Sequence, residues 1–219
     1  MRRVVDLSVP MRVEDPRGTL RLEPYRTLAK DRANITLVTF DSHFSTHLDA
    51  PSHQLANAPT LETVDLKTCV GKATVLNLSE KKAGSQIDRA DLERFTALVI
   101  PGARLLLRTD WNECYGKPGH NEGYPALTVA AAAWLAERGV SLVGVDTPSV
   151  APVYEGMEIT NAVHAPLLKA GVVLVENLCR LKEVPAGPFT FIALPLHLIG
   201  LDGCPVRAVA VIDDERTAR

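Results

Sequence analysis

Hydrophobic and polar positions alternate along much of this chain in short segments that are bounded by turn-forming residues. Segments of this kind, rich in β-branched side chains, predict strands, whereas apolar residues with helical spacing occur in only a few places. The expected strands cover residues 3–9, 34–40, 72–78, 103–109, 140–145, 172–176, 189–194 and 206–212. The expected helices cover residues 88–95, 128–138 and 161–170. The pattern therefore predicts a strand-rich protein with few helices.

The last two expected helices carry clear start and stop signals. Thr128 and Asn161 precede them as N-caps, and Gly139 and Gly171 follow them, where a residue in the left-handed region commonly ends a helix. From the first of these helices onward, a helix, a strand, a helix and a strand follow in order. This βαβ pattern requires a parallel pair of strands. The other strands lack intervening helices, so the sheet should be mixed. No linker or repeat appears, and residues 1–219 are expected to form a single α/β domain.

Composition narrows the range of partners. Of the 219 residues, 46% are hydrophobic and 23% are charged, and a formal charge of -2 gives no electrostatic reason to expect nucleic acid or an anionic membrane. No apolar stretch approaches the ~18 residues of a membrane span, and no signal-peptide pattern follows the first residue. A cytoplasmic enzyme that acts on a small molecule is the expected class. The four cysteines form no CxxC pair and are expected to be reduced; they are Cys69, Cys114, Cys179 and Cys204.

Residues 41–53 hold three of the six histidines, interleaved with carboxylates. Neutral imidazole and carboxylate oxygen are ligands of zinc, manganese and ferrous iron, and a catalytic ion needs about three protein ligands and an open position. His43, His47 and Asp49 could supply the three ligands. His53 would then be free to act as a general acid and base. The alternative is three unrelated structural histidines.

The spacing of this cluster favours an extended chain over a helix. A period of two places His43, His47, Asp49 and His53 on one side, whereas a helix would point Asp49 away from the two preceding histidines. In a flat strand the α-carbons of His43 and His47 would lie roughly 13 Å apart. Both can reach one ion only if the chain bends, and we predict a bend or bulge at residues 45–46.

Distant residues are candidates for the rest of the site. His164 is expected in the first turn of its helix, and Glu176 ends an apolar strand, where a buried charge would need a cation. A surface glutamate and a helix-face histidine remain the alternatives for these two. Asp146 is a third candidate, but its Asp-Thr-Pro context favours a turn. His120 is expected in a loop and His197 in the sheet, neither as a ligand.

The segment from His43 to His53 resembles the HxxxHxDAPxH motif of the cyclase family of metal-dependent hydrolases, whose best-known members are bacterial kynurenine formamidases. Other segments also look like this family, at residues 4–10 before the motif and at residues 144–150, 176–178, 193–196 and 203–208 after it. The resemblance implies a fold of the swivelling β/α/β type and a homodimer or a higher homo-oligomer.

The resemblance also implies a ligand set for one or two divalent ions, zinc or manganese. The residues that correspond to the ligands of one ion are His43, His47 and Asp49. Asp49 and Glu176 would bridge to a second ion, which His164 would also bind.

The activity that the resemblance implies is hydrolysis of a small amide, with His53 as the proton donor and acceptor. Two departures from the family pattern bear on this. Ser45 stands where the family commonly has glycine, and residues 10–25 lack the tryptophan that packs on the aromatic substrate of kynurenine formamidases.

Two other functions remain open at this point. A cyclic amide hydrolase, such as the isatin hydrolases that resemble this family and use manganese, would need the same centre with a different pocket. A protein that binds metal or ligand without turnover would keep the ligands but would not need His53. Trp111 and Tyr115 either line the substrate pocket or pack within their loop.

Overall fold

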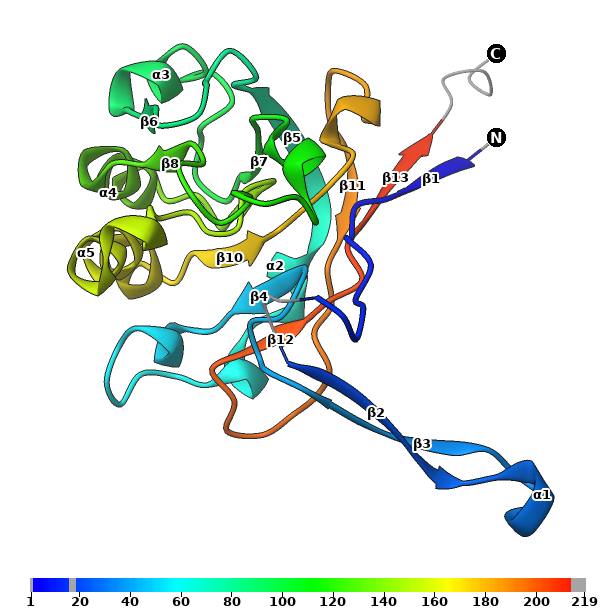
Figure 1. Ribbon diagram of the computed structural model, residues 1–219. Helices are drawn as coiled ribbons and strands as arrows, with labels where there is room; N and C mark the ends of the chain where they lie inside the picture. The colour runs from blue at the N-terminus through cyan, green and yellow to red at the C-terminus, as the bar shows by residue number, and fades with distance from the viewer. Residues whose placement is uncertain (1, 16–18, 214–219) are drawn as a thin grey trace.

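The computed structural model describes residues 2–15 and 19–213. Its centre is a curled nine-stranded sheet. Helices cover one of its faces, and both ends of the described chain lie at the same edge (Figure 1). In order across the sheet the strands are β1 (Arg2–Asp6), β13 (Val209–Asp213), β11 (Phe189–Ile192), β5 (Val70–Asn77), β7 (Arg104–Arg108), β9 (Leu142–Val145), β10 (Val173–Glu176), β4 (His47–Asp49) and β12 (Gly203–Pro205).

The sheet is mixed, as the sequence predicts. Strands β5, β7, β9 and β10 pair in parallel, whereas all the other neighbours are antiparallel. The parallel pair β9 and β10 flanks a helix, which confirms the predicted βαβ unit. The α/β class with few helices is also confirmed, since the described residues contain five α-helices: α1 (Leu28–Asp31), α2 (Leu66–Cys69), α3 (Arg89–Glu93), α4 (Val129–Glu137) and α5 (Met157–Lys169).

Helix α4 begins as expected, but α5 does not. The Thr128 side chain accepts a hydrogen bond from the backbone N–H of Ala131, which confirms this residue as the N-cap. Helix α5 instead starts after Gly156, so the expectation that Asn161 caps it is wrong. Asn161 lies inside the helix, and His164 lies in its middle and not in its first turn. Gly156, with φ 109°, makes the turn into the helix that the sequence pattern assigned to Asn161.

Two hydrophobic cores lie on opposite faces of the sheet. Helices α3, α4 and α5 pack on one face through residues such as Leu135 and Leu167. The other face curls around a second core that includes Leu48, Phe191 and Cys204. The curl brings the end of β1 close to the end of β10, where Ser8 and Leu178 form an isolated bridge.

The strand expected at 206–212 is confirmed at residues 209–212, which belong to β13, whereas the preceding strand β12 was not predicted. Strand β12 pairs with β4, whereas β13 pairs with β1 and β11. The chain therefore crosses between the two ends of the curled sheet at residues 206–208, a change of partner that local sequence pattern does not encode.

The expected strand at 34–40 lies outside the central sheet. Here β3 (Ile35–Phe40) pairs with β2 (Leu20–Arg26), which the sequence pattern did not predict. The hairpin projects from the body with α1 at its tip (Figure 1). We call residues 20–40 the arm. The remaining described strands, β6 (Gln86–Ile87) and β8 (Ala126–Leu127), form a short parallel pair. No helix among residues 2–15 and 19–213 is long and apolar enough to cross a membrane.

Candidate metal centre

Strand pairing brings the distant parts of the centre together. Strand β4 lies between β10 and β12, with His47 opposite Glu176 and Asp49 opposite Gly203. A Cβ on Gly203 would lie 2.7 Å from Cε1 of His43, so only glycine allows β12 to approach this histidine so closely. The sheet register therefore positions residues that are more than a hundred positions apart in the chain.

The predicted bend in the cluster is confirmed at Ser45. This residue has φ 65°, in the left-handed region, and its hydroxyl donates to the carbonyl of Val9 at 3.0 Å. Thr46 then donates to the carbonyl of Asn177 at 2.6 Å, which ties the bend to the end of β10. The extended chain is limited to β4, however, and the prediction of an extended segment through His53 is wrong. Residues Pro51–His53 form a 3-10 turn, because Pro51 has no backbone N–H to contribute to a strand ladder.

Asp49 is the common member of the cluster and is completely buried. Its Oδ1 lies 2.9 Å from Nδ1 of His43 and 3.3 Å from Nε2 of His47. Its Oδ2 lies 3.9 Å from Nε2 of His164. Two sets of three ligand atoms within 4.8 Å of one another share this carboxylate, one with His43 and His53 and one with His47 and Glu176. The arrangement therefore offers two neighbouring positions for a cation.

Glu176 and His164 form the far side of the centre. Glu176 Oε2 lies 3.5 Å from Nε2 of His47, and its Oε1 lies 3.5 Å from Nε2 of His164. The Glu176 carboxylate is also held by Ser149, whose hydroxyl donates at 2.9 Å, and by the backbone N–H of Val150 at 2.7 Å. The structure thus brings both distant candidates into the cluster that begins at residue 43.

The histidines are oriented to present one nitrogen to the centre. Nδ1 of His47 lies 2.9 Å from the carbonyl of Ser45, and Nδ1 of His164 lies 2.9 Å from the carbonyl of Thr160. A carbonyl can only accept, so each Nδ1 carries the hydrogen. The Nε2 atoms are left with the lone pairs that bind metals, the usual arrangement of metal-ligating histidines.

The donor set fits a divalent cation. Oδ2 of Asp49 is buried and has no hydrogen-bond partner among the described residues. An unpaired buried carboxylate oxygen is costly, and the cost would be removed by a cation. Imidazole nitrogens and carboxylate oxygens together are the ligands of zinc, manganese and iron.

His53, the predicted general acid and base, lies at the edge of the cluster. Its ring centroid lies 3.8 Å from that of His43 and 5.8 Å from that of His164. The amide nitrogen of Gln54 lies 3.1 Å from its Nε2, and Oδ2 of Asp202 lies 3.7 Å from its Nδ1. The half-buried ring is therefore placed to contact both the centre and a substrate.

Asp202 is the site residue that sequence reasoning missed. Its Oδ2 lies 2.9 Å from Nε2 of His43, in addition to its contact with His53. Asp202 directly precedes β12, and the pairing of β12 with β4 brings it to the cluster. It is about 150 residues from the motif, and the only local signal is a carboxylate beside a glycine in a turn-like segment.

The electrostatics of the cluster favour charged carboxylates beside protonated imidazoles when no cation is bound. Burial and the nearby Asp49 by themselves would raise the pKa of Glu176, but hydrogen bonds from His164 and His47 lower it to about 2. Burial likewise opposes ionisation of Asp49, yet hydrogen bonds from His43 and His47 hold its pKa well below its usual range. Burial lowers and the carboxylate partners raise the pKa of each of these three histidines, and the net direction is upward.

Metal affinity is therefore expected to increase with pH. An incoming cation must displace protons from His43, His47 and His164, whose pKa values are raised. The affinity should fall as the pH decreases through these raised values, and binding should release protons. Calorimetric titration of metal-free protein with zinc, in buffers of different ionisation enthalpy between about pH 6 and pH 8, measures both quantities. A pH-independent affinity without proton release would contradict this charge arrangement.

The remaining candidates lie outside the cluster. Asp146 is buried and accepts hydrogen bonds from Thr109 and from the backbone N–H of Asp110, so it joins the loops after β7 and β9. The turn expected at this residue agrees with its position directly after β9. His120 lies in a loop, as expected. His197 lies in an exposed loop between β11 and β12, so its expected place in the sheet is wrong.

Comparisons with known proteins agree with this geometry. The Cyclase family model matches residues 5–152. Kynurenine formamidases from Bacillus mycoides and Bacillus cereus are each 37% identical over 177 residues, which cover 80% of this chain and 79% of the relative.

Among solved structures, isatin hydrolase A from Labrenzia aggregata, bound to benzyl benzoate, superposes with a TM-score of 0.85 at 22% identity, covering 97% of this chain and 94% of that one. A predicted metal-dependent hydrolase from Bacillus stearothermophilus superposes with a TM-score of 0.78 at 25% identity, covering 96% and 98%. The family model and these relatives, together with the motif from His43 to His53, show that the chain belongs to the cyclase family.

Proposed function

We propose that the protein is a divalent-metal-dependent amide hydrolase, most like a kynurenine formamidase, which converts N-formylkynurenine and water to kynurenine and formate. The kynurenine formamidases at 37% identity support this substrate class. The observation that carries the proposal is the orphaned Oδ2 of Asp49, buried among imidazoles and carboxylates. A buried carboxylate oxygen without a hydrogen bond is costly, and a bound cation would remove that cost.

The ligands of this proposal are the residues that the geometry gathers around Asp49. His43, His47 and Asp49 would hold one ion, and Asp49, Glu176 and His164 would hold a second. One or two ions, zinc or manganese, fit this mixed donor set. A bound divalent cation would stabilise negative charge on the amide carbonyl oxygen and increase the acidity of water.

His53 would move the proton that the reaction transfers. Burial lowers its pKa from the ordinary value, so the ring is neutral near pH 7 and can accept a proton from the attacking water. It would then donate that proton to the amide nitrogen as the carbon–nitrogen bond breaks. Asp202, beside Nδ1 of His53, favours the hydrogen on that nitrogen and leaves Nε2 to exchange protons.

The test compares N-formylkynurenine and isatin side by side, after elemental analysis of the purified protein. Formate release with bound metal would support a kynurenine formamidase. Opening of the isatin ring without formate release would favour a cyclic amide hydrolase, the function suggested by the isatin hydrolase fold match. If metal-loaded protein hydrolyses no amide, lactam or lactone, the non-catalytic metal-binding or ligand-binding alternative takes precedence.

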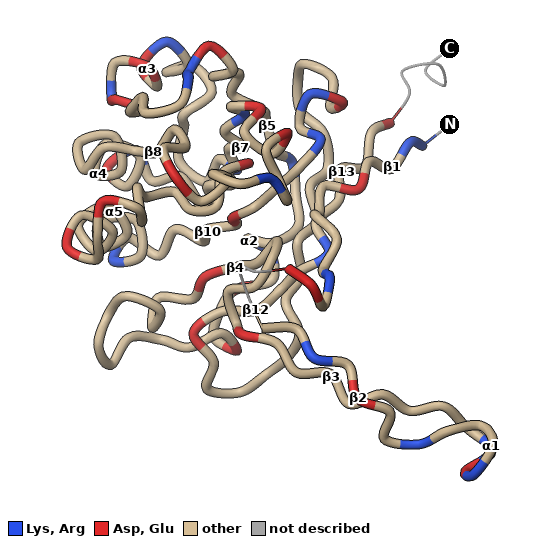
Figure 2. Tube along the Cα trace, viewed as in Figure 1, with Lys and Arg blue, Asp and Glu red and all other residues tan. Residues whose placement is uncertain are grey.

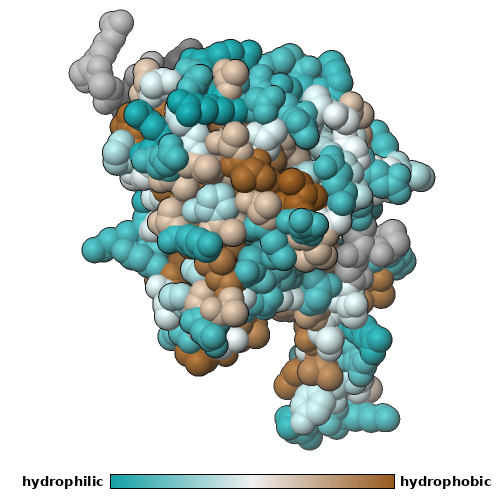
Figure 3. Space-filling model, turned by 90° about the vertical axis from the view of Figure 1, so that its left-hand side faces the viewer, coloured by the Kyte–Doolittle hydropathy of each residue, from teal (hydrophilic) through white to brown (hydrophobic). Residues whose placement is uncertain are grey.

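We further propose that the protein is a homodimer or higher homo-oligomer in which a second copy covers the arm. Leu22 and Val38 are directly opposed in the β2–β3 ladder and therefore share a face, where they are 52% and 48% exposed. An isolated two-stranded hairpin is marginally stable in water. Figure 3 shows apolar side chains on the projecting arm, and Figure 2 places charged residues around α1 at its tip. An uncovered apolar face on such an element favours a protein partner.

Replacing both Leu22 and Val38 by Asp should convert the oligomer to a monomer, because charge on this face would have to be buried. Light scattering coupled to gel filtration measures the change in mass. Arg21→Ala, whose side chain alternates to the other face of β2, is the matched control and should keep the assembly. A wild-type monomer, or an unchanged mass in the double variant, would contradict the role of the arm.

The remaining proposals concern localisation, domain organisation and the class of partner. We propose a cytoplasmic enzyme, which agrees with four unpaired cysteines. Residues 1–219 are proposed to form one hydrolase domain, since one curled sheet runs through the described part of the chain. The expected substrate is a small molecule, and the net charge of -2 gives no basis for nucleic-acid binding.

A further inference from the structure

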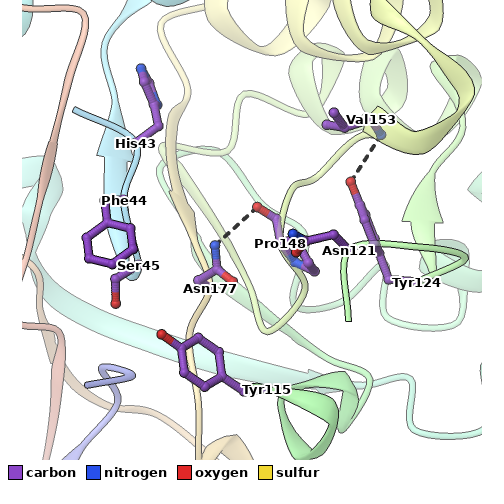
Figure 4. A pocket seen from close by; sticks show the side chains of 9 residues that line it. All are labelled: His43, Phe44, Ser45, Tyr115, Asn121, Tyr124, Pro148, Val153 and Asn177. Carbon is purple, nitrogen blue, oxygen red and sulfur yellow. Dashed lines mark hydrogen bonds between the residues drawn. The ribbon is translucent and has the colours of Figure 1, made fainter. Parts of the chain in front are cut away.

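A cavity of about 220 Å³ opens beside His43, next to the candidate metal centre (Figure 4). Its walls include the aromatic rings of Phe44, Tyr115 and Tyr124, and Asn177 contributes a polar edge. These residues come from the cluster bend, from the loops after β7 and from the end of β10. The cavity thus adjoins the candidate metal ligands, because His43 belongs to both.

The size and polarity of the cavity limit what can occupy it. An apolar cavity of roughly 150 Å³ is enough to hold benzene, so about 220 Å³ accommodates one substituted aromatic ring. Of the described residues that line it, none is Lys, Arg, Asp or Glu. A charged group would lose its hydration there without gaining a partner. The cavity therefore favours an uncharged group of about this size.

Tyr115 connects the cavity to the segment that follows β1. It directly follows the 3-10 turn Trp111–Cys114. Its hydroxyl lies 3.1 Å from the carbonyl of Pro10 and 2.9 Å from Oδ2 of Asp15. Both partners belong to the segment that lacks a tryptophan in this chain. An aromatic ring from a different segment thus lies against that stretch, whereas Trp111 donates to the carbonyl of His120 within its own loop.

Resting on the proposed amide hydrolase function, we propose that this cavity binds the aromatic ring that carries the amide nitrogen of the substrate. Tyr115 is its specificity-determining residue. The ring would pack against Tyr115 and leave the carbonyl to face the centre beyond His43. Tyr115 suits this role because its aromatic ring lines the cavity, and it is this ring surface that would contact the substrate.

The test compares Tyr115→Ala with Tyr115→Phe in metal-loaded protein. Tyr115→Phe keeps the ring and removes the hydroxyl that contacts Pro10 and Asp15. The substrates are formanilide, an aryl formamide, and N-butylformamide, an alkyl formamide. Since an aromatic pair contributes about 0.5–1.5 kcal/mol, the ratio of kcat/KM for the aryl over the alkyl substrate should fall roughly 2- to 13-fold in Tyr115→Ala. It should change less than about twofold in Tyr115→Phe, which retains the stacking surface. An equal loss on both substrates would indicate a structural role and overturn the inference.

A binding measurement separates this inference from the proposed function. Calorimetric titration with 2-aminobenzamide, a neutral aromatic amine, needs no turnover. Weaker binding in Tyr115→Ala than in Tyr115→Phe would support the cavity assignment even if neither formamide is hydrolysed, an outcome that would refute only the hydrolase function. Hydrolysis with an unchanged substrate ratio and unchanged 2-aminobenzamide binding in Tyr115→Ala would refute only the cavity assignment.

Discussion

Replacing Asp49 by Asn should remove the metal and abolish amide hydrolysis. Asp49 is the carboxylate common to both candidate cation positions, and the substitution removes its negative charge and replaces one ligand oxygen by an NH2 group, which cannot bind a cation. Changes in residues that only support ligands already cost about 10- to 100-fold in metal affinity. Loss of the shared ligand should therefore cost more than about 100-fold. Elemental analysis after dialysis and assay of hydrolysis measure the two effects.

The matched control is another buried aspartate, Asp146, which lies outside the cluster. It accepts hydrogen bonds from three donors on Thr109 and Asp110, and burial raises its pKa to about 6. Asp146→Asn would turn an N–H group toward these donors and should reduce the free energy of unfolding by about 1–3 kcal/mol while the metal is kept. If both variants lose metal equally, general damage to the fold explains the result and the role of Asp49 is wrong.

Replacing His53 by Ala should reduce kcat by about 10²- to 10⁴-fold, the usual contribution of a general acid and base. The metal should remain, because the ligands assigned to both ions do not include His53. The amide nitrogen is a poor leaving group unless it is protonated, so the loss should be greatest for substrates with the most basic leaving amine. Steady-state kinetics at several pH values, together with metal analysis of the same samples, provide the measurement.

His197→Ala is the control for a general effect of removing a histidine, since its side chain lies in an exposed loop. It should leave kcat and metal content unchanged. Metal loss in His53→Ala as large as that in Asp49→Asn would show that His53 is a ligand, an arrangement that its grouping with His43 and Asp49 permits. The proton transfer would then have to be assigned to another residue.

Local chemistry made much of this protein predictable. The caps, glycines and helical spacing around Thr128 located α4 within one or two residues, because these signals act within a turn of chain. The bend at Ser45 followed from geometry alone, since two histidines four residues apart in a flat strand cannot reach one ion. The start of α5 was missed because Asn161 is a plausible cap in sequence, whereas Gly156 makes the turn into the helix.

Sequence pattern was sufficient to predict which residues can bind a metal and that the sheet is mixed. Imidazole and carboxylate groups have this chemistry wherever they lie, and the alternation of strands with helices requires parallel pairs. Three features became visible only in the folded molecule: Asp202 joins the cluster, Tyr115 contacts Pro10 and Asp15, and β2 and β3 pair outside the central sheet. The reason is physical: these contacts depend on strand register and on the curl of the sheet. Both are set by the packing of the whole molecule and not by the neighbours of any one residue.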